Sequence, residues 1–212
     1  MGPRATAENC VDTFLYERDL STRGYTCIAG VDEVGRGPLA GPVVAACVSL
    51  PLDCDPAPFI DSKKTSPRQR VHLAARLREY GATVGVGIVS HLCVDRVNIL
   101  QASLLAMRLA VFNHDLSRKA DFLLVDGKFE IPLPSRQIPL VRGESKSASI
   151  AAASIVAKLF RDTLMERLAV KYPQYGFAQN KGYPTKTHRQ AISRHGPCAI
   201  HRLSFKGVRD FV

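Results

Sequence analysis

Short apolar runs along the chain predict a set of buried β-strands. Residues 26–31, 43–50, 83–89 and 122–125 consist mostly of apolar residues, with few polar interruptions. Runs of this length without strict polar alternation are typical of strands that are covered on both faces. The second run stops at Pro51, and three prolines within residues 51–58 predict a loop there.

Longer segments between and after these strands predict helices. Ser66-Pro67 begins one helix, because proline is favoured at the first helical position, and Gly81 ends it. A further helix is expected over residues 98–113, where Leu100, Leu104, Met107 and Val111 form one apolar stripe. Other helices are expected over residues 11–20, over residues 147–168 around Ala151-Ala152-Ala153, and from near Thr187 to Gly196.

The order of these elements predicts an α/β fold, a mixed β-sheet flanked by helices. Residues 1–24 are expected to form an N-terminal arm with a short helix, and residues 25–170 the core. Residues 171–212 are rich in Gly, Pro and aromatic residues. They predict a small C-terminal appendage of helix and loop that faces the substrate.

Composition and charge narrow the class of protein. Forty-six per cent of the 212 residues are apolar, which excludes a disordered or collagen-like chain. The formal net charge of +10 favours a polyanionic partner such as nucleic acid, although a generic basic protein would share it. The six cysteines form no C-x-x-C pair and indicate a reducing compartment. With no secretory segment and no 18-residue apolar span, the protein is predicted to be cytoplasmic, without membrane contact.

Three acidic residues follow directly after predicted buried strands. Asp32 and Glu33 end the first run, and Asp126 ends the run at residues 122–125. Several carboxylates brought together at strand ends are costly unless a cation compensates them, and oxygen-only ligands favour Mg²⁺ or Mn²⁺. From these residues alone the alternative stays open that they are turn residues, since Asp126 precedes Gly127 and glycine also follows the first pair.

A glycine-rich segment, Gly35-Arg36-Gly37-Pro38-Leu39-Ala40-Gly41, follows the first strand. It is not expected to bind a dinucleotide, because it leads into another strand, whereas a dinucleotide-binding loop opens a helix. The glycines would instead allow the backbone to approach a sugar closely, with Arg36 reaching a phosphate.

These residues resemble the signature of the type 2 ribonuclease H family, the ribonucleases HII. The signature segment is Asp32-Glu33-Val34-Gly35-Arg36-Gly37-Pro38. The resemblance as a whole covers roughly residues 26–207, with its segments in the expected order. Further matching segments are Asp61-Ser62-Lys63-Lys64, Val125-Asp126-Gly127, Ser149-Ile150-Ala151-Ala152-Ala153-Ser154, Arg161-Asp162, Asn180-Lys181-Gly182-Tyr183 and His201-Arg202.

The resemblance implies a ribonuclease H-like core and an endonuclease that cuts RNA paired with DNA. It implies action on single ribonucleotides in duplex DNA, with 5′-phosphate and 3′-hydroxyl products. By the same resemblance, Asp32, Glu33 and Asp126 would bind two Mn²⁺ or Mg²⁺ ions. Gly35, Arg36 and Gly37 would read the 2′-hydroxyl at the RNA-to-DNA junction, Tyr183 would pack on the next deoxyribose, and Lys63 and Lys64 would contact phosphates.

The fourth acid departs from the family pattern. Bacterial relatives usually carry a Gly-Asp pair ahead of the long helix, and this chain has Gly143-Glu144. Glu144 still offers carboxylate oxygens for a second metal. Asp162, within the predicted long helix, is the alternative, although pairing with a nearby base is the expected role for it.

Two other interpretations remain open at this point. A ribonuclease HIII would share the core, but such enzymes normally carry a long N-terminal extension and different residues around the glycines. A non-catalytic binder of structured nucleic acid would gain nothing from an acidic cluster facing phosphates. The chain is expected to act as a monomer, and His188 and His201 in the basic tail are candidates for contact with phosphate.

Overall fold

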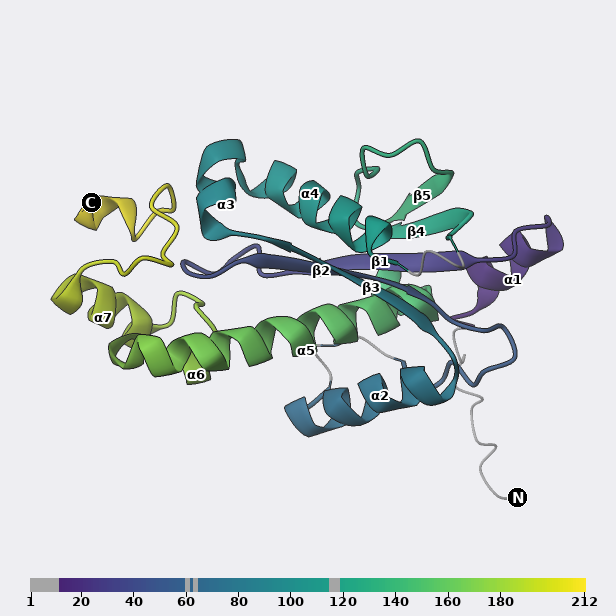
Figure 1. Cartoon of the computed structure of the whole chain (residues 1–212), viewed down its shortest axis with the longest axis horizontal. Helices are drawn as coiled ribbons and strands as arrows, with labels where there is room; N and C mark the ends of the chain where they lie inside the picture. Colours follow the sequence, from purple (N-terminus) through teal and green to yellow (C-terminus); the bar gives the residue numbers. More distant parts are fainter. Residues whose placement is uncertain (1–11, 60–61, 63–64, 115–118) are drawn as a thin grey trace, which may run out of the picture.

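The computed structural model describes residues 12–59, 62, 65–114 and 119–212, and its centre is one five-stranded sheet (Figure 1). The strand order is β3-β2-β1-β4-β5. β1 pairs antiparallel with β2 and parallel with β4, β2 pairs antiparallel with β3, and β4 pairs parallel with β5. The strands are β1 (Ile28–Val34), β2 (Val43–Ser49), β3 (Thr83–Val89), β4 (Phe122–Asp126) and β5 (Gln137–Leu140).

Four of the five strands are those that the apolar runs predict, and the mixed sheet confirms the predicted class. β5 was not predicted, because its four residues include Pro139, which suggests a break in a strand. Proline is tolerated on an edge strand, where one side of the backbone has no pairing partner, and β5 lies at the edge of this sheet.

Helices cover both faces of the sheet (Figure 1). α4 (Ile99–Phe112) packs on β2 and β3, and α3 (His91–Val97) precedes it. On the opposite face, α5 (Ala148–Lys171) packs on β1 and β2, and α2 (Pro67–Glu79) packs on α5. No helix in the described part of the chain is long and apolar enough to cross a membrane.

α5 can lie directly on β1 because Gly30 has no side chain. A Cβ atom added at Gly30 would lie 2.1 Å from the backbone nitrogen of Ile150. The alanines at 151–153 are fully buried, as their small size predicts for a close helix–sheet contact. α1 (Leu15–Thr22) secures the start of α5, since Glu17 accepts hydrogen bonds from Ser147 Oγ at 2.6 Å and from the Ser149 amide at 3.1 Å.

The C-terminal part of the chain packs at the far end of α5 (Figure 1). It contains η3 (Pro173–Tyr175), α6 (Phe177–Asn180), α7 (Lys186–His195) and η4 (Arg209–Phe211). Its buried cluster includes Tyr175, Phe177 and Ile192 together with Leu39 and Met165, so this segment shares a core with α5 and with the glycine-rich segment. The proposed boundaries near residues 24 and 171 stay predictions.

We predict that Gly30→Ala destabilises the fold. The added methyl group meets rigid helix backbone, so α5 must move away from β1, and overpacking of this kind costs about 1–3 kcal/mol. The measurement is the free energy of unfolding from urea denaturation. Gly37→Ala is the control, because its methyl group meets nothing closer than 3.8 Å. Equal stability of Gly30→Ala and wild type would contradict the proposed contact.

Candidate active site

The acids predicted from the sequence lie at the ends of two neighbouring parallel strands. Val31 of β1 is paired with Val125 of β4, so Asp32 and Asp126 follow at the same edge of the sheet. Asp32 is 5% exposed, and its Oδ1 accepts a hydrogen bond of 2.7 Å from the Glu33 amide. The central position of β1 thus places Asp32 and Glu33 beside Asp126.

Glu144 is brought to the same place by a short turn. Asp126 Oδ1 accepts a hydrogen bond of 2.7 Å from the amide of Gly143, the residue before Glu144. A Cβ atom at Gly143 would lie 2.6 Å from Ile150 Cδ1, so only glycine fits this approach without a shift. The hydroxyl of Ser154 in α5 donates to Glu144 Oε2 at 3.3 Å, and the same hydroxyl lowers the pKa of the Asp32 carboxyl. Ser154 therefore lies close to two of the acids.

Burial and neighbouring acids raise the pKa of Asp32 and of Glu33. Burial raises the pKa of Asp32 well above its ordinary value, and the charges of Glu33, Asp126 and Glu144 raise that pKa further, against the effect of the Ser154 hydrogen bond. Burial also raises the pKa of Glu33, while the nearby Arg36 guanidinium opposes that rise. The site therefore concentrates negative charge away from water.

This donor set fits a hard divalent cation in chemistry. All four side chains are carboxylates, the ligands that Mg²⁺ and Mn²⁺ prefer. Among the described residues, however, no group of three or more His, Cys, Asp or Glu side chains is already in position to hold an ion. The acids are close enough to interact electrostatically, but their side chains are not arranged to coordinate an ion in this structure.

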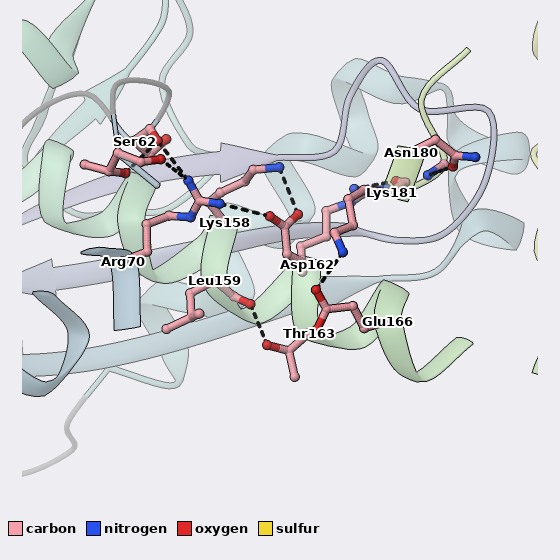
Figure 2. A network of polar contacts seen from close by, with 12 residues as sticks. Ser62, Arg70, Lys158, Leu159, Asp162, Thr163, Glu166, Asn180 and Lys181 are labelled. Carbon is pink, nitrogen blue, oxygen red and sulfur yellow. Dashed lines mark hydrogen bonds and ion pairs between the residues drawn. The ribbon is translucent and has the colours of Figure 1, made fainter. Parts of the chain in front are cut away.

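Asp162 is engaged elsewhere (Figure 2). Its Oδ1 lies 2.8 Å from Lys158 Nζ and its Oδ2 lies 3.4 Å from Arg70 Nη2. Arg70 also donates to the backbone carbonyls of Ser62 and Thr65. This confirms the expected pairing of Asp162 with nearby bases. The charges that raise the pKa of Asp32 are those of Glu33, Asp126 and Glu144, and that of Asp162 is not among them.

The glycine-rich loop, residues 35–41, lies beside the acids and connects β1 to β2, as predicted. Arg36 Nη1 lies 3.1 Å from Glu33 Oε1, so in this structure the guanidinium pairs with an acid of the site. A shallow cleft of about 30 Å³ is lined by Glu33, Arg36, Asp126 and Gly127, together with residues of α4 and Lys128 and Phe129. The loop and the acids thus border one cleft.

Tyr183 lies across from Gly37. A Cβ atom at Gly37 would be 3.8 Å from Tyr183 Cε1, and the tyrosine is 38% exposed. Lys158 Nζ and the Arg161 guanidinium carbon lie 5.8 Å and 5.9 Å from the centre of its ring. The ring therefore offers an accessible face next to the loop, in positively charged surroundings.

Lys63 and Lys64 lie outside the described residues. Their neighbour Ser62 is described, and its Oγ is 2.9 Å from Ser154 Oγ. Ser62 is thus connected to the hydroxyl that donates to Glu144.

The expectation that His188 and His201 lie near phosphates was wrong. They are 0% and 1% exposed, and their Nε2 atoms lie 3.1 Å apart. His188 Nδ1 is 2.9 Å from the Tyr183 carbonyl oxygen, and His201 lies 2.9 Å from the Cys198 amide. Burial lowers the pKa of both rings, that of His201 to about 4, and the charges of His188 and His91 lower the pKa of His201 further.

Three residues that matter for this arrangement were not predicted. Ser154 was only one letter of a matching segment, and nothing in its position marks a hydroxyl between two acids. Arg161 and Arg202 are fully buried and bind backbone carbonyls of the loop. Arginine is mostly exposed in proteins, so a sequence gives little sign that these two are inside.

Comparisons with known proteins agree with the fold. The solved ribonuclease H2 of Pyrococcus horikoshii OT3 superposes with a TM-score of 0.71 at 24% identity, covering 88% of this chain and 97% of that one. A ribonuclease HII of Archaeoglobus fulgidus, solved in complex with PCNA, gives 0.70 at 25% identity, covering 85% and 96%. The fold is therefore that of a type 2 ribonuclease H.

Sequence relatives define the family more closely. A model of the family described as ribonuclease HII matches residues 29–208. The ribonuclease HII of Desulfotalea psychrophila is 57% identical over 95% of this chain and 90% of its own length, and that of Bacillus subtilis is 44% identical over 98% and 80%. The chain belongs to the ribonuclease HII family and is a ribonuclease H endonuclease. Ribonuclease HIII structures share the fold at 17–20% identity, so that alternative has no support beyond the fold.

We predict that Asp32→Asn stabilises the metal-free protein. Because the folded-state pKa of Asp32 is raised, its contribution to stability is complete below the unfolded-state pKa and is lost as the pH rises through the folded-state pKa. At pH 8 in EDTA the amide removes the repulsion, and a gain of about 1 kcal/mol raises the melting temperature by about 2–4 °C in a chain of this size.

Thermal unfolding between pH 5 and pH 8 measures this effect. The gain should shrink as the pH falls, and added Mg²⁺ should stabilise wild type more than Asp32→Asn. Asp53→Asn, which changes an exposed loop acid, is the matched control. A variant that melts below wild type at pH 8 in EDTA would show that the carboxylate is not repelled.

Proposed function

We propose that Asp32, Glu33, Asp126 and Glu144 bind two Mn²⁺ or Mg²⁺ ions and so form the catalytic site. The observation that carries this proposal is the field of charge at Asp32, a buried carboxylate whose pKa is raised by three other acids from β1, β4 and the turn before α5. Among solved proteins of the same fold, a ribonuclease HIII is in complex with Mn²⁺. Such ions, when bound, activate water and stabilise the leaving oxygen of a phosphodiester.

The proposed substrates are RNA–DNA hybrids and duplex DNA that contains ribonucleotides, cut to leave 5′-phosphate and 3′-hydroxyl ends. Gly35, Arg36 and Gly37 would read the 2′-hydroxyl, since their loop borders the acidic cleft. Tyr183 would stack on the deoxyribose next to the cut, because its exposed ring faces Gly37. Lys63 and Lys64 would contact phosphates and so hold the duplex without reading its sequence.

Cytoplasmic location and a monomeric state stay predictions. The described cysteines at positions 27, 47, 54, 93 and 198 form no disulfide with one another. This agrees with a reducing compartment. Size-exclusion chromatography with light scattering would report the oligomeric state.

We predict that Asp126→Asn abolishes cleavage while binding persists. The substitution removes one ligand charge and leaves the basic surface unchanged, so kcat should fall by at least about 10²-fold. The assay is cleavage of a DNA duplex with one ribonucleotide, with and without Mn²⁺ or Mg²⁺, alongside binding by fluorescence anisotropy. If the metal-loaded wild type binds this duplex without cutting it, the proposed activity on embedded ribonucleotides fails. Full activity of Asp126→Asn would remove Asp126 from the site.

We predict that a substitution at Glu144 affects cleavage, whereas a substitution at Asp162 affects stability. Glu144→Gln should slow cleavage or weaken metal dependence by roughly 10–100-fold, because the amide lacks a ligand charge. Asp162→Asn should leave the metal titration unchanged. It should lower the free energy of unfolding by about 3 kcal/mol, because Arg70 loses its partner. The measurements are rate against Mn²⁺ concentration and urea denaturation of both variants. The reverse assignment of effects would transfer the second-metal role to Asp162.

A further inference from the structure

The loop of residues 35–41 is folded around the guanidinium group of Arg202. This side chain is fully buried, and all three of its nitrogens donate to loop carbonyls. Nε donates to Gly41 O at 3.1 Å, Nη1 to Arg36 O at 3.0 Å and Pro38 O at 2.8 Å, and Nη2 to Gly35 O at 2.6 Å and Gly41 O at 2.9 Å. One side chain from the C-terminal segment thus fixes the orientation of most peptide groups in the loop.

Two further carbonyls of the loop, and that of Pro42 just after it, are also bound from the inside. Arg202 donates its own amide to Leu39 O at 2.8 Å. Arg161, from α5, donates to Ala40 O at 3.2 Å and to Pro42 O at 3.0 Å. The acceptor side of the loop is therefore turned toward two arginines in the interior of the protein.

Peptide geometry then determines where two of the amides point. In a trans peptide the C=O of one residue and the N–H of the next point in opposite directions, and the described chain contains no cis peptide. Gly35 O and Arg36 O point at Arg202, so the amides of Arg36 and Gly37 point away from it. Within the described residues, neither amide donates a hydrogen bond.

Two of the other loop amides donate hydrogen bonds. Leu39 N donates to Gly182 O at 2.8 Å, Gly41 N donates to Ile200 O at 2.9 Å, and Pro38 and Pro42 have no amide hydrogen. The amides of Gly35 and Ala40 also donate no hydrogen bond within the described residues, but those of Arg36 and Gly37 are the ones next to the cleft and Tyr183.

Arginine is suited to this position and lysine is not. The planar guanidinium has five N–H groups in fixed directions and can serve several carbonyls at once, whereas an ammonium group has three donors on one atom. In the described part of the chain Arg202 forms no ion pair, and carbonyl groups accept all of its side-chain hydrogen bonds. Burial and the neighbouring charge of Arg161 lower the pKa of Arg202.

We propose that Arg202 is a positioning residue for substrate selectivity, which holds the loop so that the amides of Arg36 and Gly37 present two donors to the ribose 2′-hydroxyl. The inference rests on the proposed reading of the substrate by this loop. It assigns to the C-terminal segment a role in selectivity that acts entirely through the backbone, without contact between Arg202 and the substrate.

The test compares Arg202→Lys with Arg70→Lys. Arg70 is also a buried arginine that donates to backbone carbonyls, but it does not contact the loop (Figure 2). Fluorescence anisotropy in EDTA gives the ratio of affinities for a duplex with one ribonucleotide and for the same duplex in all-DNA form. Kinetics in Mn²⁺ give kcat and KM, and thermal unfolding gives the stability of each variant.

For Arg202→Lys we expect the affinity ratio to fall about 10-fold or more, toward one, as the loss of two hydrogen bonds implies. Affinity for all-DNA duplex should stay unchanged, and KM should rise more than kcat falls. Arg70→Lys should lower the melting temperature and keep the ratio. The inference is overturned if Arg202→Lys keeps the ratio, or if Arg70→Lys loses as much of it. A wild-type ratio of one would instead overturn the proposed reading by the loop itself.

A second variant covers the case in which Arg202→Lys does not fold. Arg202→Ala leaves a space of the shape of a guanidinium group, so guanidinium ion at low, non-denaturing concentration should occupy it and restore the affinity ratio. The same concentration should not change the ratio of Arg70→Ala. Recovery of the fold by guanidinium without recovery of the ratio would show that Arg202 supports stability alone.

Discussion

Repulsion between carboxylates that are held out of water is the interaction to which the rest of this structure responds. Asp32 is almost completely buried, and three other acids act on it. Such groups would separate or take up protons if the chain allowed it. They stay together because β1 and β4 are paired in a fixed register, and because the turn at Gly143 is hydrogen-bonded to Asp126. The stability of the sheet therefore keeps the acidic site in its unfavourable state.

The buried cations are distributed so that this charge is not neutralised within the protein. Lys158 and Arg70 pair with Asp162, which is therefore satisfied. Arg161 and Arg202 bind carbonyl groups instead of acids. Within the acidic site, Arg36 forms the ion pair with Glu33, and its side chain is half exposed. A site that binds metal cations needs acids that are not already neutralised by buried Lys or Arg side chains. The described part of the chain meets this condition.

Most of the fold could be predicted from the sequence. The apolar runs indicate buried strands, and proline and glycine residues mark the helix ends. Asp32, Glu33 and Asp126 became candidates from their positions at the ends of apolar runs, which left a role in turns open, and Glu144 was added by the family resemblance. β5 was missed because a four-residue edge strand with Pro139 has no distinctive pattern. The roles of Arg202, Ser154 and the His188–His201 pair could not be predicted, because they depend on contacts between residues far apart in the chain. His201 in particular lies in a basic segment, and only the packing of Tyr175 and Phe177 around it places it inside.

α5 connects the acidic site to the loop of residues 35–41 and sets the spacing between them. Ser154, which donates to Glu144, and Arg161, which donates to the loop carbonyl of Ala40, are separated by seven residues, or about two helical turns. They therefore project from the same side of the helix, with a rise of about 10 Å between them. One inserted residue between them would rotate Arg161 by about 100° away from the loop. Side chains on the outer face of the helix can therefore change. The number of residues between Ser154 and Arg161 cannot, because it is fixed by the distance from the acids to the loop.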